Sequence, residues 1–249
     1  MPTQPLSGKS ALVTGGARRI GHAIALTLAK AGADVGITYR RSRAEATATA
    51  QEIEGLGRRA LATECEVRSE ASVRGAIEEF ITQFGRLDLL VNNAAVFDSA
   101  ALEEISLEQW DAAFETNTRG PFLLGRAALP HLRANGGRIV NIGSLGGIHA
   151  WAGHAHYCAS KAALHMLTGA MAKSFAPEVS VNCVAPGWIE FGSPEMDEKP
   201  TEEARRFAAR TPMRRNGTAE DVAQAVLFFA TGPSFITGQV LAVDGGLGL

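Results

Sequence analysis

The chain has 249 residues, enough for one α/β domain with a sizeable core, and 46% of them are hydrophobic while 20% are charged. A formal net charge of −2 leaves no global field that would recruit nucleic acid or an anionic membrane. The three cysteines, Cys65, Cys158 and Cys183, are widely spaced, and no apolar run approaches the length of a membrane span. The N-terminus also lacks a secretory pattern, so we expect a cytoplasmic protein with reduced thiols.

Strand and helix patterns alternate along the chain. A short apolar run at 11–14 meets a glycine turn, and apolar residues then recur at helical spacing until Gly32. Ser42 with Glu45 predicts a capping box at the start of the next helix, and Ser69 is the expected cap of the helix after that. The predicted strands are residues 11–14, 34–39, 60–65, 87–91, 138–142, 179–184 and 239–243.

The longest helical pattern lies between the fourth and fifth predicted strands. It starts at Ser106 and ends near residue 135. We expect breaks at Gly120-Pro121 and at Pro130, because proline lacks the backbone donor that a helix interior needs.

After the fifth strand, a helix is expected from about Tyr157 to Pro177, and Thr218 starts the last helix. The polar, proline-bearing segment 187–216 reads as a long loop, which is either a lid over a site or a surface loop. The chain shows no linker-like tract or internal repeat, so residues 1–249 are expected to form one domain. The strand–helix alternation indicates a parallel sheet with helices on both faces.

A glycine-rich turn joins the first strand to the first helix. Gly15 and Gly16 allow a sharp backbone turn, and Gly21 allows the helix to pack close to the sheet. The free N–H groups and partial positive charge of a helix N-terminus suit a pyrophosphate. We therefore expect a dinucleotide to bind here, with a purely structural turn as the alternative.

The second strand ends in Tyr39-Arg40-Arg41-Ser42. A site for NAD is expected to carry an acidic residue at this point, where it holds the ribose hydroxyls. Two guanidinium groups and a hydroxyl fit a ribose 2′-phosphate instead, because arginine matches the geometry of phosphate. The residues favour NADPH/NADP+ over NADH, and the alternative is an exposed basic turn.

Tyr157 and Lys161 are four residues apart at the start of a predicted helix. Residues at this spacing lie on one face of a helix, so the phenol and the ammonium point the same way. A nearby cation favours the phenolate and lowers the pKa of the tyrosine, which would make Tyr157 a usable acid and base.

Several further segments, taken in order, resemble the short-chain dehydrogenase/reductase family over nearly the whole chain. They are the glycine turn, Asn92-Asn93-Ala94-Ala95, Asn117, Ser144 at thirteen residues before Tyr157, Pro186-Gly187, Thr211-Pro212-Met213-Arg214-Arg215 with Asp221, and Val243-Asp244-Gly245-Gly246. The resemblance implies a single-domain, Rossmann-type, doubly wound parallel sheet and an NADP-dependent oxidoreductase. It also implies a homotetramer, the usual assembly of the family.

The resemblance implies a mechanism in which a hydride passes from the nicotinamide to a carbonyl carbon. Tyr157 supplies the proton, and Ser144 hydrogen-bonds the same oxygen. Lys161 keeps the pKa of the tyrosine low and holds the nicotinamide ribose, while Asn117 holds a water that relays protons to Lys161. The residues that the resemblance assigns to the cofactor are Gly15, Arg18, Arg19, Ile20, Tyr39, Arg40, Arg41, Ser42, Glu66, Val67, Asn93, Ala94, Ala95, Tyr157, Lys161, Pro186, Gly187 and Ile189.

Departures from the family pattern bear on the substrate. Arg19 stands where many members carry a glycine. The turn that contains Arg19, together with the Tyr-x-Arg-Ser segment after the second strand, resembles the pteridine reductase branch of the family. Members of that branch carry an aspartate at the position of Ser144, where it helps to protonate a pterin nitrogen. Serine suits a ketone or a 3-oxoacyl thioester, so we rank a small-molecule carbonyl substrate above a pterin. Phe191 replaces the usual threonine after Pro-Gly, which puts one hydrogen bond to the nicotinamide amide in doubt.

A third hypothesis is a non-catalytic regulator that senses NADPH. The four intact catalytic positions argue against it, because a sensor has no need of all of them.

Three aromatic residues are candidates for contact with the substrate. Phe97, Trp151 and Trp188 lie just past a strand end or just before Tyr157, where a substrate ring or acyl chain would rest. Ordinary loop packing is the alternative for each of them.

Three histidines fall in the same region, at His149, His154 and His156. No acidic residue or cysteine accompanies them at the spacing of metal ligands, so we predict no metal site.

Overall fold

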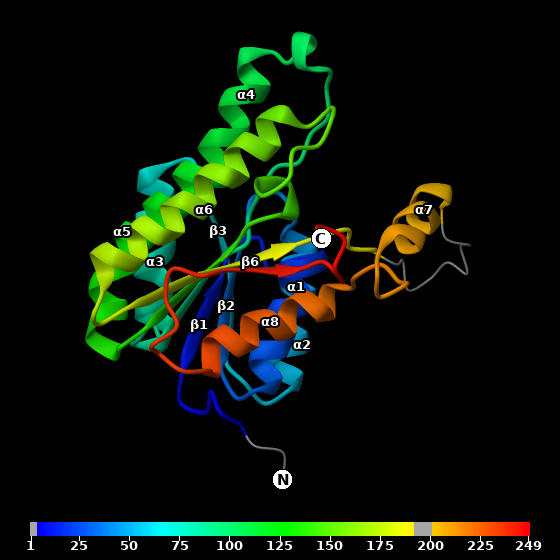
Figure 1. Cartoon of the computed structure of the whole chain (residues 1–249). Coiled ribbons are helices and arrows are strands. Elements are labelled where there is room, and N and C mark those ends of the chain that lie inside the picture. Colours follow the sequence, from blue (N-terminus) through cyan, green and yellow to red (C-terminus); the bar gives the residue numbers. More distant parts are fainter. Residues whose placement is uncertain (1–3, 192–200) are drawn as a thin grey trace.

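The computed structural model describes residues 4–191 and 201–249. Seven parallel strands form one sheet in the order β3-β2-β1-β4-β5-β6-β7, which confirms the expected doubly wound parallel sheet (Figure 1). The strands are β1 (Ser10–Val13), β2 (Asp34–Tyr39), β3 (Ala60–Glu64), β4 (Leu89–Asn92), β5 (Arg138–Ile142), β6 (Ser180–Pro186) and β7 (Val240–Val243).

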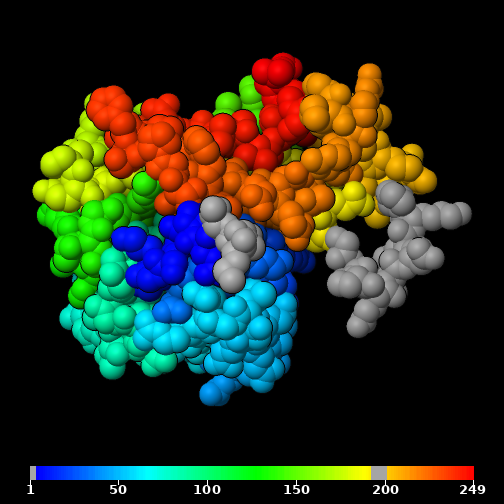
Figure 2. Space-filling view, turned by 90° about the horizontal axis from the view of Figure 1, so that it is seen from below, coloured from blue at the N-terminus to red at the C-terminus, as the bar shows by residue number. Residues whose placement is uncertain are grey.

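Helices cover both faces of the sheet (Figure 1). One layer contains α1 (Arg19–Lys30), α2 (Arg43–Gly55) and α8 (Ala219–Thr231). The other contains α3 (Glu70–Phe84), α5 (Gly120–Asn135) and α6 (Ala155–Phe175), with α4 (Leu107–Phe114) beyond it. In Figure 2 the orange residues of α8 lie against the blue N-terminal segments, in agreement with the packing of α8 on α1.

Each face of the sheet has its own hydrophobic core. Ala11 and Val13 of β1 point into the core under α1 and α8, whereas Leu12 points into the core under α3 and α5. Successive side chains of a strand point to opposite faces, so a short apolar strand can serve both cores.

The sheet changes winding direction between β1 and β4. The chain moves outward from β1 to β3, then crosses back so that β4 pairs with the other edge of β1. In open α/β sheets a crevice forms at such a switch point, beyond the carboxyl ends of the strands. The topology therefore places the glycine turn after β1 and the asparagines after β4 beside one crevice.

Most of the predicted helix starts are confirmed. The Ser69 side chain accepts a hydrogen bond from Ser72 N at the start of α3. Complete capping boxes are present at Ser106 with Gln109 and at Thr218.

The predicted capping box at Ser42 is wrong. Ser42 precedes α2, but its side chain forms no capping bond, and its ψ of 56° lies outside the extended region that N-caps adopt. Glu45 faces Arg18 instead, with 3.5 Å between the carboxylate and guanidinium atoms.

The break predicted at Pro130 is also wrong, because α5 continues through this residue. Leu124, Ala128 and Leu132 are buried on either side of the proline and hold both halves of the helix against the sheet. The interruption expected near Gly120-Pro121 takes the form of a π-helical turn at Glu115–Arg119, which joins α4 to α5.

The segment 187–216 is less irregular than its composition suggested. It contains a helix, α7 (Glu202–Arg210), which projects from the body of the molecule (Figure 1). Thr201 caps it by accepting a bond from Ala204 N, and acidic residues fill its first turn. Residues 192–200 of the predicted loop lie outside the described residues.

Within the two described ranges, 4–191 and 201–249, the helices are too short or too polar to cross a lipid bilayer.

Candidate active site

A cavity of about 570 Å³ opens at the carboxyl ends of β1 to β4. This volume lies in the range of ligand-binding clefts. The predicted cofactor residues that line it are Gly15, Arg18, Arg19, Ile20, Tyr39, Arg40, Arg41, Ser42, Glu66, Val67, Asn93, Ala94 and Ala95.

Five predicted cofactor residues do not line this cavity in the described structure. Tyr157 and Lys161 lie on α6, and Pro186 and Gly187 lie where β6 ends beside β7. Ile189 forms an isolated bridge to Gly217.

Several lining residues were not predicted as cofactor contacts. Thr38 is an interior strand residue whose hydroxyl accepts from Gly15 N at 3.3 Å, and its position beside the turn follows from the β1–β2 register. The others are Ala17, Gly21, Cys65, Val96, Thr116 and Phe191. These residues line the cavity because of their places in the loops and turns that follow the strands, and residue type alone does not reveal those places.

The glycine turn is held rigidly by its neighbours. Gly15 has a positive φ of 62°, and a side chain on Gly21 would collide with the Gly15 carbonyl oxygen. Asn93 Nδ2 donates to the carbonyls of Thr14 and Gly15, at 2.9 and 3.0 Å. The turn therefore presents the N-terminus of α1 to the cavity, as a bound pyrophosphate requires.

Arg19 adopts a backbone conformation that favours glycine. Its φ is +53°, in the left-handed region that costs a side-chain-bearing residue about 1–2 kcal/mol. Its guanidinium lies over the Phe191 ring, 5.1 Å from the centroid, and both residues line the cavity. The resemblance predicts glycine at this position, and the arginine that occupies it adopts the left-handed conformation that glycine favours.

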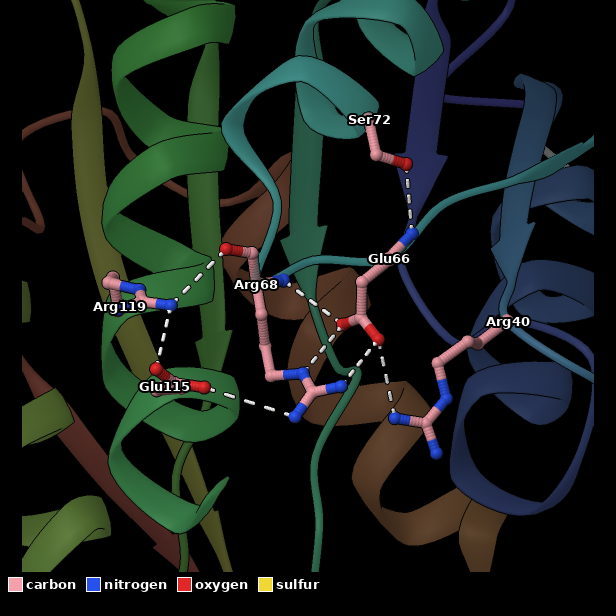
Figure 3. A network of polar contacts seen from close by, with 6 residues as sticks. All are labelled: Arg40, Glu66, Arg68, Ser72, Glu115 and Arg119. Atoms are coloured by element: carbon pink, nitrogen blue, oxygen red, sulfur yellow. Dashed lines mark hydrogen bonds and ion pairs between the residues drawn. The ribbon is translucent and has the colours of Figure 1, made fainter. Parts of the chain in front are cut away.

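The corner of the cavity beyond β2 and β3 is rich in charge. Arg40, Arg41 and Ser42 line it together with Glu66. Arg68 hydrogen-bonds the Glu66 carboxylate and is the main reason that the pKa of Glu66 falls to about 2 (Figure 3). The acid therefore stays ionised throughout the physiological range.

Ser144, Tyr157 and Lys161 meet where β5 ends and α6 begins. Lys161 Nζ donates to the Ile142 carbonyl at 2.8 Å and lies 5.8 Å from the centroid of the Tyr157 ring. Ser144 Oγ accepts from Gly146 N at 3.0 Å.

The expected lowering of the tyrosine pKa is wrong. Burial raises the pKa of Tyr157, and a hydrogen bond with the Ser144 side chain opposes the rise only in part. Burial also lowers the pKa of Lys161 to about 8. The ammonium donates to a backbone carbonyl, and desolvation by burial is the largest influence on the pKa of the phenol.

Asn117 lies in the π-helical turn and is buried. Its Nδ2 donates to the Val96 carbonyl and to Ser160 Oγ, both at 3.0 Å, and its Oδ1 accepts from Val96 N at 2.9 Å. The side-chain amide thus ties the loop after β4 to α6, and the water that we expected it to hold remains a prediction.

His165 is a neighbour of Ser144 that the sequence analysis did not identify. Its Nε2 accepts from Ser144 N at 3.4 Å, and the ring packs against Gly143 and Gly147. Its spacing of four residues from Lys161 on the same helix is the signal that could have identified it.

Two of the three aromatic residues predicted to contact the substrate lie beside Tyr157. The Phe97 ring meets the tyrosine edge-on at 4.8 Å, and Trp151 lies nearly parallel to it at 6.3 Å. Trp188 instead stacks on Phe207 of α7 at 4.0 Å. The structure brings Phe97 and Trp151 together at the phenol and places Trp188 with α7.

The histidines occupy separate environments. His154 stacks on Phe97 at 4.6 Å and contacts the Asp98 carbonyl through Nδ1, while His156 is buried on α6. Residues 4–191 and 201–249 hold no group of three or more His, Cys, Asp or Glu side chains that could bind a metal ion.

Residues 15–248 match a family model described as enoyl-(acyl carrier protein) reductase. The chain is 38% identical over 245 residues to an uncharacterised oxidoreductase of Methylorubrum extorquens, covering 97% of this chain and 98% of that protein. It is also 38% identical over 246 residues to the 3-oxoacyl-(acyl-carrier-protein) reductase FabG of Thermotoga maritima, with 97% and 98% covered.

Solved structures are similar over the whole fold. A short-chain dehydrogenase from Burkholderia cenocepacia in complex with NADP is 40% identical, with a TM-score of 0.90 and 98% of this chain and 100% of that chain covered. A blue fluorescent protein from a metagenomic library, in complex with NADPH, is 39% identical, with a TM-score of 0.90 and 98% and 99% covered.

Proposed function

The chain belongs to the short-chain dehydrogenase/reductase family and is an NADP-dependent oxidoreductase, and we propose that its substrate is a ketone or a 3-oxoacyl thioester. The observation that carries this proposal is the position of Ser144, rather than a carboxylate, beside the Tyr157 phenol, where the serine side chain opposes the rise in the pKa of the tyrosine. Two neighbouring neutral hydroxyls suit a carbonyl oxygen, which needs one donor to hold it and one to protonate it.

Each residue of the group has a role that its surroundings support. NADPH, when bound, supplies the hydride. Tyr157 gives its phenolic proton to the substrate oxygen, and Ser144 donates a second hydrogen bond as negative charge develops there. Lys161, with its pKa near 8, can return a proton toward the phenol at neutral pH. Asn117 fixes the turn beside them.

A pterin is the second candidate substrate. The observations in its favour are the Arg19 guanidinium over the Phe191 ring at the cavity and the Phe97 ring beside Tyr157, which is 61% exposed. A flat ring could stack there, but Ser144 cannot supply the carboxyl proton that a ring nitrogen needs.

A substrate panel tests the proposal. We expect NADPH oxidation, followed by nicotinamide absorbance, with acetoacetyl thioesters or diketones and much less with dihydrobiopterin. Tyr157→Phe should lower turnover by about 10²–10⁴-fold, the usual contribution of a general acid, while leaving NADPH affinity within about threefold. Faster pterin than ketone turnover, or an active Tyr157→Phe variant, would contradict the proposal.

We also propose a homotetrameric, cytoplasmic protein. The exposed Met166, together with the small exposed residues Ala162 and Ala170, supports close packing of α6 on a second copy. The three cysteines are free and buried, as expected in a reducing compartment. The segment 187–216 remains our candidate for the substrate loop, with the Trp188–Phe207 stack fixing α7 to its start.

A further inference from the structure

An acidic residue lines the part of the cavity that we assign to the 2′-phosphate. Glu66 lines the cavity together with Arg40, Arg41 and Ser42. A free carboxylate there would oppose phosphate binding in two ways. It would repel the phosphate directly, and it would hold the guanidinium of Arg40 as a counterion.

Arg68 donates hydrogen bonds to both carboxylate oxygens of Glu66. Its Nε donates to Oε1 at 3.0 Å and its Nη2 donates to Oε2 at 2.9 Å, a two-pronged pairing (Figure 3). The backbone N–H of Arg68 adds a third bond to Oε1 at 3.2 Å. Arg40 reaches the same carboxylate only through Nη1, at 3.5 Å from Oε2.

Arg68 is itself positioned by contacts with Glu115 and Arg119. Glu115 Oε2 lies 3.9 Å from its Nη1, and Arg119 pairs with Glu115 at 3.0 Å (Figure 3). Arg119 also donates to the Arg68 carbonyl at 3.4 Å. In the described part of the chain Arg68 is not among the residues that line the cavity, so it acts on the phosphate corner only through Glu66.

We propose that Arg68 is a specificity-determining residue for NADPH, which acts by neutralising Glu66 and leaving Arg40 free to bind the 2′-phosphate. A bidentate arginine–carboxylate pair is stronger than a single long contact, so Glu66 keeps Arg68 and releases Arg40 when a phosphate competes. The inference rests on our placing of the 2′-phosphate beside Arg40, Arg41 and Ser42.

Charge counting makes the effect specific to the phosphate. Without Arg68, Glu66 pairs with Arg40 and its negative charge faces the cavity. NADPH then loses the attraction between its 2′-phosphate and Arg40 and is repelled by the Glu66 carboxylate. NADH is not affected in this way, because it has no 2′-phosphate. Removing Glu66 as well cancels the change, because the acid that needed neutralising is gone.

The test compares cofactor affinities of the full-length protein by energy transfer from tryptophan to bound NADPH or NADH. Arg68→Gln should weaken NADPH about tenfold and NADH by less than about twofold, in line with the loss of one charge-assisted contact. Glu66→Gln/Arg68→Gln should return NADPH affinity to within about threefold of the unaltered protein. Arg74→Gln removes a comparable surface arginine, which pairs with Glu70 at 3.8 Å, and should change neither affinity.

Each of the following outcomes would overturn the inference. Equal weakening of both cofactors by Arg68→Gln would mean that Arg68 only stabilises the chain between β3 and α3. No change in NADPH affinity, or no recovery in the double variant, would exclude neutralisation of Glu66. If Arg68→Gln fails to fold, Glu66→Gln alone decides: tighter NADPH binding with unchanged NADH affinity supports the inference, and unchanged or weaker NADPH binding contradicts it.

Failure of this inference and failure of the proposed substrate class are separable. The affinities are measured without a carbonyl or pterin substrate, so a negative substrate panel leaves them unaffected. Arg40→Ala tests the placing of the 2′-phosphate itself. If this variant keeps full NADPH affinity, the phosphate binds elsewhere and the role of Arg68 is rejected with it.

Discussion

Lys161 lies in an enclosed position on α6 with only 2% of its surface exposed. Its ammonium donates to the Ile142 carbonyl, which is a dipole rather than a full negative charge. Loss of water around the cation therefore lowers the pKa of Lys161 from 10.5 to about 8. A lysine that titrates near neutral pH is suited to exchange protons with a neighbouring phenol.

The depressed pKa of Lys161 makes a prediction about the cofactor-free protein. The folded pKa lies below the unfolded value, so the unfolded state binds more protons between about pH 8 and pH 10.5. The contribution of Lys161 to the free energy of unfolding is therefore lowest below about pH 8 and rises as the pH increases. Relative to Lys161→Met, the unaltered protein should gain about 1 kcal/mol between about pH 8 and pH 9.

Urea unfolding of both proteins at the two pH values measures this gain. Burial raises the pKa of Cys65 to about 11 and of Cys183 to about 12, so both thiols act in the opposite direction. Both thiols stay protonated in the fold up to about pH 9 whether or not Lys161 is present, so their contributions cancel in the difference. A difference that stays constant with pH would show that Lys161 keeps its ordinary pKa in the fold.

At the scale of elements, the start of α1 depends on a close approach of backbone to backbone. The Gly21 Cα faces the Gly15 carbonyl and the Asn93 side chain without room for a methyl group. The same contact fixes the turn that presents the α1 N-terminus to the cavity.

Gly21→Ala should therefore cost about 1–3 kcal/mol in the free energy of unfolding, as overpacking of a tight contact does, and should weaken NADPH binding. Gly75→Ala is the matched control in α3, where a Cβ meets nothing within 4 Å. It should stabilise the protein by about 0.5–1 kcal/mol, because alanine is the better helix former. Denaturant titrations and cofactor titrations of both variants provide the measurement, and a neutral Gly21→Ala would refute the close approach.

Local sequence signals predicted the elements well where the local physics decides them. Ser69, Ser106 and Thr218 cap helices as expected, because a cap needs only a hydroxyl and a free N–H within one turn. Pro130 misled the prediction because burial of both halves of α5 outweighs a missing donor. The segment that forms α7 was predicted to be part of a loop, because its composition is polar and it contains few apolar residues.

At the scale of the molecule, α6 presents an apolar side chain to solvent on the layer opposite α1 and α8. Met166 is 76% exposed. If α6 packs on a second copy in the proposed tetramer, Met166→Asp should shift the mass in light scattering to a smaller species without changing the circular dichroism.

The control for this prediction is Leu56→Asp. Leu56 is 39% exposed at the end of α2, on the other face of the sheet. It should leave the assembly intact. A monomer for the unaltered protein, or dissociation by both variants, would reject the proposed interface.

The sequence alone determined the order of the seven strands and of every long helix except α7, the parallel sheet, the glycine turn and the identity of Ser144, Tyr157 and Lys161 as candidates. These follow from periodicity, from turn chemistry and from the motif resemblance, all of which are properties of short segments. Only the tertiary structure decided which groups act on one another. It buried Lys161 against a carbonyl and left Tyr157 with a raised pKa, because desolvation depends on every neighbour in space. It also brought Arg40 and Glu115 to the pair formed by Glu66 and Arg68, because distant segments meet only at the carboxyl edge of the folded sheet.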